Sequence, residues 1–200
     1  MQGPSYSRRF RIRTSLALGA SFIVGATAVF ASVHVLGRAL GVVDLPVAAR
    51  AGLGAAGLLT LAGIDVRAAR RSMYCPLGRR RQTPNALMHR HSPTFVATVW
   101  GFDIGLAVTT VRVAALTWGA FLLVGLGMAT WFTGFVYGVA FAVPIVVLLW
   151  THKVGRLATI RGPVDPGLEA MLAKRKTLQV VSAVLLAASG VIMIGLALFQ

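Results

Sequence analysis

The chain alternates between long apolar stretches and short basic ones. Residues 94–150 form an almost unbroken apolar run that carries only two charged side chains, Asp103 and Arg112. One helix needs about 20 residues to cross the hydrocarbon core of a bilayer, so a run of this length holds at least two crossings. The pattern is that of an integral membrane protein.

Other apolar stretches, at 15–36, 47–66 and 178–199, each have the length of one membrane-spanning helix. Strand-like alternation is absent, and a hydrocarbon environment admits only helices or closed barrels. We therefore expect an all-α fold, a polytopic transmembrane helical bundle in a single domain. Dividing the long run into 94–126 and 129–150, the former as one continuous helix, predicts five spans. A division into three shorter helices, with breaks near Arg112 and Thr133, would give six.

The basic residues set the expected orientation. Most of the 20 lysines and arginines lie before residue 15 or in the loops 67–93 and 151–177. The positive-inside rule places these segments in the cytoplasm, which requires an even number of spans between the two loops. We expect a multi-pass protein of the bacterial-type plasma (inner) membrane, with a cytoplasmic N-terminus.

The net charge of +15 bears on which kind of partner the protein binds. In a soluble protein it would suggest nucleic acid, but the basic loops lack the aromatic and base-reading residues of such interfaces. Arg79, Arg80 and Arg81 are instead candidates for binding anionic lipid headgroups. We expect the lipid bilayer as a partner and no nucleic acid.

Two charged residues inside the predicted third span are candidates for function. A carboxylate near mid-membrane, such as Asp103, costs at least about 2.5 kcal/mol unless it is paired or protonated. On a continuous helix, Asp103 shares a face with Thr110, while Arg112 shares the opposite face with Thr109. Together they predict a small polar cavity for a proton, an ion or an anionic group. Alternatively, Asp103 pairs with a basic residue of a neighbouring helix and Arg112 extends to the membrane surface.

Pairs of small residues predict close contacts between helices. Gly101 and Gly105 form one small-xxx-small pair, and Gly134 and Gly138 form another. Each pair is expected to pack within the bundle or against a partner subunit. A similar row of small side chains lies in the predicted second span: Gly52, Ala56 and Gly63.

The residues that could bind a metal or cofactor do not form a recognisable motif. Cys75 is the only cysteine, so it has no intramolecular disulfide partner. His89 and His91 match no zinc-ligand spacing, and the predicted topology places His34 and His152 at opposite membrane faces, too far apart for one haem. We expect no metal, no cofactor and no catalytic residue.

Two short segments resemble a family of small bacterial multi-pass membrane proteins. They are residues 80–83, Arg-Arg-Gln-Thr, and residues 101–106, Gly-Phe-Asp-Ile-Gly-Leu. Some members of that family are similar to thiol-disulfide electron carriers of the CcdA and MauE type. The resemblance implies redox transfer through a pair of membrane-embedded cysteines, but this chain has only Cys75, in a loop. The redox activity therefore does not carry over.

These observations favour a non-catalytic accessory or structural subunit of a membrane complex, with a membrane-protein partner or a homo-oligomer. One alternative is a small transporter or proton-coupled carrier that uses Asp103 and Arg112. A second alternative is a membrane thiol-redox component in which Cys75 reacts with a partner's thiol.

Overall fold

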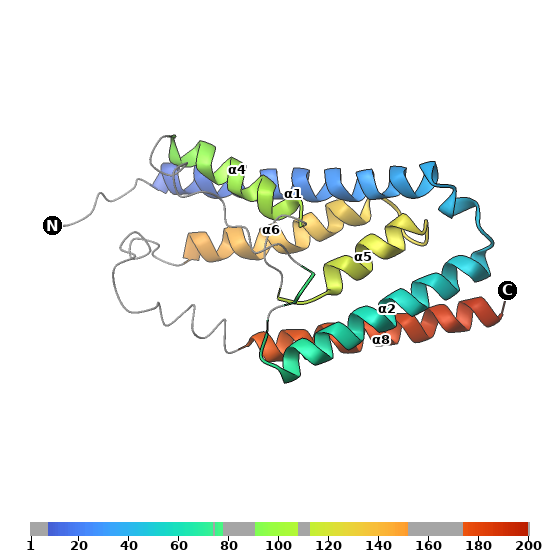
Figure 1. The fold of residues 1–200 in the computed structure, drawn as a ribbon. Coiled ribbons are helices and arrows are strands. Elements are labelled where there is room, and N and C mark those ends of the chain that lie inside the picture. Colours follow the sequence, from blue (N-terminus) through green and yellow to red (C-terminus); the bar gives the residue numbers. More distant parts are fainter. Residues whose placement is uncertain (1–7, 74, 78–90, 108–112, 152–173, 200) are drawn as a thin grey trace.

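The computed structural model describes residues 8–73, 75–77, 91–107, 113–151 and 174–199. Every regular element in these ranges is a helix (Figure 1). In chain order they are α1 (Arg8–Ala39), the single-turn 3-10 helix η1 (Val42–Asp44), α2 (Val47–Arg70), α4 (Pro93–Gly105), α5 (Leu116–Gly125), α6 (Thr133–Thr151) and α8 (Arg175–Leu198). For the described residues, the all-α prediction is confirmed.

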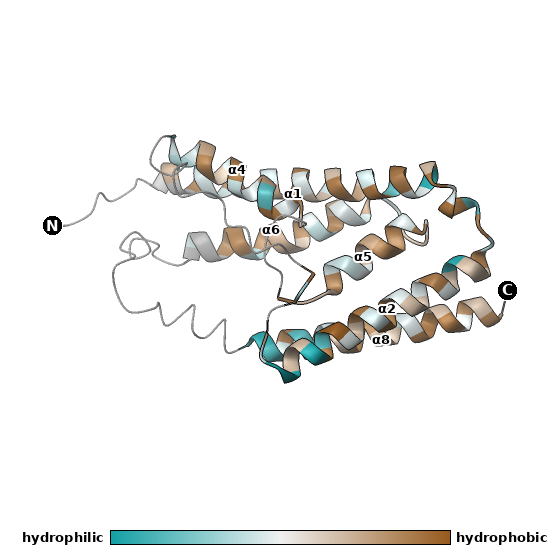
Figure 2. Ribbon diagram, viewed as in Figure 1, coloured by the Kyte–Doolittle hydropathy of each residue, from teal (hydrophilic) through white to brown (hydrophobic). Residues whose placement is uncertain are grey.

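Three of these helices are long and apolar enough to cross a membrane: α1, α2 and α8. Large hydrophobic side chains are exposed on their outer faces, among them Val24, Leu53, Val184 and Ile192. Figure 2 shows hydrophobic residues along the helices and hydrophilic residues gathered where α2 ends and α8 begins. Exposed apolar surface of this extent is expected where lipid tails, and not water, surround the helices.

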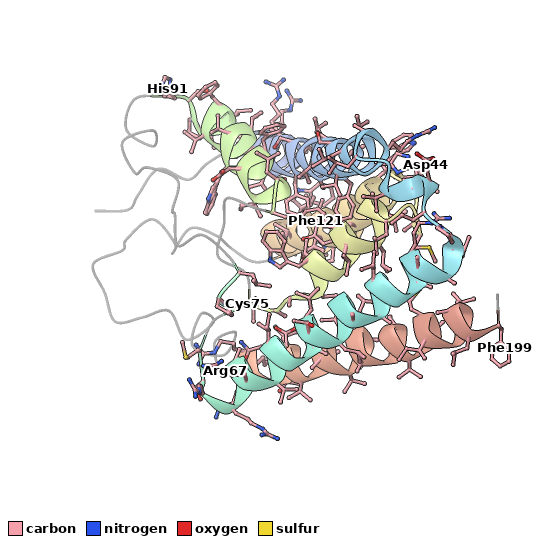
Figure 3. All side chains as sticks on the ribbon, turned by 45° about the vertical axis from the view of Figure 1, so that its right-hand side comes forward. Asp44, Arg67, Cys75, His91, Phe121 and Phe199 are labelled. Carbon is pink, nitrogen blue, oxygen red and sulfur yellow. The ribbon has the colours of Figure 1, made fainter. Side chains whose placement is uncertain are left out.

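The helices form two groups joined by α5 (Figure 1). In one group α1 packs against α4 and α6; in the other, α2 and α8 form a long pair. On one side of α5, Phe121 packs against Phe30 of α1, with 4.6 Å between the ring centroids. On its other side, Leu122 packs against the cluster that contains Leu58 and Leu186 of the α2–α8 pair. Figure 3 shows Phe121 in the interior, on the α1 side of α5.

The expectation of one continuous helix over 94–126 is wrong. Helix α4 ends at Gly105, Ala107 has a left-handed backbone with φ 61°, and α5 begins only at Leu116. The two halves have different partners, because α4 packs along α1 whereas the start of α5 meets α2. The helix that holds Asp103 therefore ends at Gly105, and the argument that places Asp103 and Arg112 on opposite faces of one continuous helix fails.

The glycines of α4 lie directly against α1. A Cβ atom on Gly101 would overlap the carbonyl oxygen of Leu18, and one on Gly105 would overlap that of Phe22. Both obstacles are backbone atoms, which cannot rotate away as a side chain can. Close approach of α4 to α1 therefore requires glycine at both positions.

The glycines of α6 lie against α1 at other positions. A Cβ on Gly134 would come within 2.6 Å of the Cβ of Phe30, and one on Gly138 within 2.9 Å of the Cα of Ile23. At the far end of α6, the indole N–H of Trp150 donates a hydrogen bond to the hydroxyl of Ser15. Helix α6 thus follows α1 in the opposite direction along much of its length.

We predict that Gly101→Ala destabilises the protein, whereas Gly52→Ala does not. The added methyl group at residue 101 meets backbone, and overpacking of this kind costs roughly 1–3 kcal/mol. At Gly52 nothing lies within 4 Å of the added atom, so alanine should be neutral or mildly stabilising in the helix. Thermal unfolding in detergent measures both. Equal midpoints for the two variants would contradict the close packing of α4 on α1.

Candidate functional site

A carboxylate is buried where α2, α8 and the start of α5 meet. Asp65, in α2, is 0% exposed. The hydroxyl of Ser182, in α8, donates a hydrogen bond to its Oδ2 at 2.5 Å. The backbone N–H of Ala115 lies 2.9 Å from both carboxylate oxygens. One side chain therefore links three segments that are distant in the sequence.

The carboxylate lies at the N-terminal end of a helix. Ala115 is the N-cap residue of α5, where unpaired N–H groups and the helix dipole produce a partial positive charge. Among the described residues, no basic side chain contacts Asp65; its polar contacts are Ser182 and Ala115. The helix end thus supplies the stabilisation that a lysine or arginine would otherwise give.

The opposite end of α5 contacts a charge of the other sign. The guanidinium of Arg50, also in α2, donates from Nη1 to the carbonyl oxygen of Leu126 at 3.3 Å and from Nε to that of Leu45 at 3.1 Å. Leu126 is the C-cap residue of α5, where the helix dipole is negative. Helix α2 therefore places a carboxylate at the N-terminal end of α5 and a guanidinium group at its C-terminal end.

Gln179 adds a second buried polar group near this junction. It is 0% exposed and precedes Ser182 by about one turn of α8. Its amide nitrogen donates to the carbonyl oxygens of Met73, at 2.8 Å, and Val113, at 3.0 Å. Its Oε1 has no hydrogen-bond partner among the described residues. A buried acceptor of this kind usually binds water or another small polar species.

Cys75 lies near the Asp65 site and is buried, with 4% of its surface exposed. It packs in the hydrophobic cluster that contains Ala62 and Ala115. Burial raises the pKa of the thiol; a hydrogen bond from the backbone at Leu77 lowers it, and the nearby charge of Asp65 raises it again. The net pKa lies above the ordinary value, so the thiol is protonated at neutral pH and poorly nucleophilic.

We predict slow alkylation of Cys75 in the folded protein. A maleimide reacts with the thiolate, whose fraction at neutral pH is reduced by the raised pKa, and burial adds a steric barrier. The rate should increase with pH and should rise steeply when the protein is unfolded in a denaturing detergent. Mass spectrometry gives an unambiguous readout because the chain has one cysteine. Rapid labelling of the folded protein at neutral pH would contradict the buried position.

Some of the residues predicted from the sequence lie within the described part of the chain, but none of them belongs to the Asp65 site. Asp103 is half-buried at the end of α4, in the α1 group, whereas Asp65 belongs to the α2–α8 pair. The four predicted packing glycines all lie against α1. The remaining candidates lie outside the described residues: Thr109, Thr110, Arg112, Arg79, Arg80 and Arg81.

Sequence reasoning missed Asp65, Ser182 and Gln179. The available signal was an aspartate inside the predicted span 47–66, and a glutamine and a serine one turn apart in the predicted span 178–199. Across the described part of the chain, no group of three or more His, Cys, Asp or Glu side chains could hold a metal ion.

Fold and site together define a helical protein with three helices of membrane-crossing length and a carboxylate buried where two of them, α2 and α8, meet the start of α5. The sequence matches no family model, and no curated protein or solved structure is significantly similar to it.

Proposed function

We propose that the protein is a multi-pass membrane carrier of the proton-coupled kind, in which Asp65 binds the proton. The observation that carries this proposal is a fully buried carboxylate without a basic partner among the described residues. Ionisable side chains within membrane helices are costly and typically mark ion or proton pathways. The proposal retains the carrier alternative but assigns the titrating role to Asp65 in place of Asp103.

The proposed topology has five crossings, with α4 and α5 in series as the third. Helix α4 has 13 residues and α5 has 10, which at about 1.5 Å per residue span together roughly 35 Å, enough for a hydrocarbon core of about 30 Å. Along α1, Gly101 lies beside Leu18, and Gly125 at the end of α5 lies beside Gly37. Interrupted helices of this kind commonly line the binding sites of carriers.

The proposed orientation follows the distribution of charge. The start of α1, the end of α2 and the start of α8 are all basic. By the positive-inside rule these ends face the cytoplasm, as expected for a bacterial-type plasma membrane protein with a cytoplasmic N-terminus. Asp65, about one turn before the basic end of α2, then lies towards the cytoplasmic side.

The proposed mechanism is that a proton weakens the attachment of α5. The charged carboxylate accepts hydrogen bonds from Ala115 and Ser182, and bonds to an ionised group are roughly twice as strong as neutral ones. Protonation removes the negative charge from the positive end of α5, so the start of this helix can separate from α2 and α8. Because α5 joins the two helix groups, proton binding would change how these groups contact each other.

Labelling with a hydrophobic carbodiimide tests this proposal. The reagent modifies protonated carboxyl groups in apolar surroundings. We expect modification of Asp65, increasing as the pH is lowered, lost in Asp65→Asn and retained in Asp103→Asn. Peptide mass spectrometry locates the adduct. A carboxylate that only caps α5 would stay ionised and inaccessible to the reagent. If no Asp65 adduct forms at any pH between mildly basic and mildly acidic, the carrier proposal is contradicted.

An accessory or structural subunit is the second candidate, and the outer face of α2 favours it. Gly52 and Gly63 have open space where a Cβ would lie, and Ala56 is exposed. Such a row of small residues allows a helix of a partner, or of a second copy, to approach closely. Crosslinking in membranes tests this role by comparing the crosslinked product of the unaltered protein with that of Gly52→Leu, which fills the space.

The buried thiol of Cys75 offers no support for the redox alternative.

A further inference from the structure

An apolar groove runs between α2 and α8 on the outside of the bundle. Its volume is about 370 Å³. Small side chains leave this space, because a Cβ atom added to Gly63 would meet nothing within 4 Å and alanines face the groove from α8. The groove is lined in part by Ala62, Gly63, Val66, Val180, Ala183 and Ala187.

The groove opens onto a cluster of arginines. An adjoining hollow shares Gly63 and Val66 with the groove and is lined by Arg67, Arg70 and Arg71 at the end of α2. All three arginines are exposed, and Arg70 lines both spaces. A single continuous depression is therefore apolar along most of its length and basic at one end.

The first turn of α8 adds positive charge at this end. Lys174 is the N-cap residue of α8, and Arg175 and Lys176 are its first two residues. Arg175 donates from Nη2 to the carbonyl oxygen of Ser72 at 2.6 Å. This hydrogen bond fixes the start of α8 beside the end of α2. Figure 2 shows the hydrophilic residues of both helices gathered there.

Acidic side chains of the described residues do not neutralise this cluster. Asp65 is fully buried and bonded to Ser182 and Ala115. Asp44 precedes α2, at the end of that helix opposite Arg67 (Figure 3), and Asp103 lies in α4, which packs on α1. Three exposed guanidinium groups thus remain for an external anion, and guanidinium groups bind phosphate oxygens in a bidentate geometry.

We propose that this depression binds one anionic phospholipid of the cytoplasmic leaflet. An acyl chain lies in the apolar groove between α2 and α8, and the phosphate contacts Arg67, Arg70 and Arg71. Charge complementarity selects a lipid over a partner helix, because a basic recess at the membrane surface next to an apolar groove matches a headgroup and its chain. The inference rests on the proposed orientation but is independent of the proton-binding role, since the lipid contacts the outer face of α2 and Asp65 is inside.

Native mass spectrometry of the full chain in mild detergent tests the site with three probes. Phosphatidylglycerol carries both a phosphate with net negative charge and acyl chains; phosphatidylcholine has the chains without net charge; glycerol phosphate has the phosphate without chains. We expect a one-to-one adduct and a raised unfolding temperature with phosphatidylglycerol alone. Equal binding of phosphatidylcholine, or binding of glycerol phosphate, would overturn the proposal.

Matched variants separate the headgroup end from the chain end. Replacing Arg67, Arg70 and Arg71 together by glutamine should weaken phosphatidylglycerol binding by about tenfold or more, the effect of losing at least one strong phosphate contact. The control replaces Arg9 and Arg13 of α1 by glutamine and should retain binding.

At the chain end, Gly63→Leu fills the groove and should abolish the adduct, whereas Gly52→Leu, in the same helix, should not. The unfolding midpoints of both variants, measured without lipid, serve as the control that they fold. Unchanged lipid binding in the arginine variant or in Gly63→Leu would refute the site, as would a co-purified polypeptide that is displaced by Gly63→Leu.

Discussion

Helix α5 is held at both ends by charges from one neighbouring helix, and the two halves of the bundle meet through it. Asp65 of α2 accepts the N–H at its positive end, and Arg50 of α2 donates to the carbonyl at its negative end. Both contacts oppose the helix dipole, an effect that is worth more in partly buried surroundings than at an exposed surface. A helix of 10 residues is short for a membrane segment, and these contacts fix its position between the α1 group and the α2–α8 pair.

In the proposed mechanism, the same carboxylate makes the junction sensitive to protons. A buried ionised group needs compensation, and here the compensation comes from one hydroxyl and one helix end. In the proposed mechanism, a proton removes the negative charge and so weakens the hydrogen bonds that Ser182 and Ala115 donate to the carboxylate. Outside, on the turn that follows Asp65, Val66 and Arg67 line the proposed lipid site. Helix α2 would thus face a proton-binding site on its inner side and a phospholipid on its outer side.

The all-helical fold and the membrane character could be predicted from the sequence, because apolar stretches of the length of a bilayer leave little choice. The sequence offered the break between Gly105 and Leu116 only as one of two alternatives, the one with breaks near Arg112 and Thr133, and could not decide between them. Hydropathy is the same for a continuous helix and an interrupted one, and the left-handed residue is Ala107, where glycine would have given a warning. Asp65 was equally hidden, because its partner Ser182 is 117 residues away. Only the packing of α8 on α2 shows that the two side chains meet.

Amide hydrogen exchange of α5 tests the central claim most directly. Asp65→Ala removes the acceptor of the Ala115 N–H, so the account predicts faster exchange, by about tenfold or more, in peptides covering residues 113–125. Peptides from α1 should exchange as in the unaltered protein, and Asp103→Asn should leave α5 unchanged. If α5 exchanges at the same rate with and without the Asp65 carboxylate, this carboxylate does not hold the helix in place and the account is contradicted.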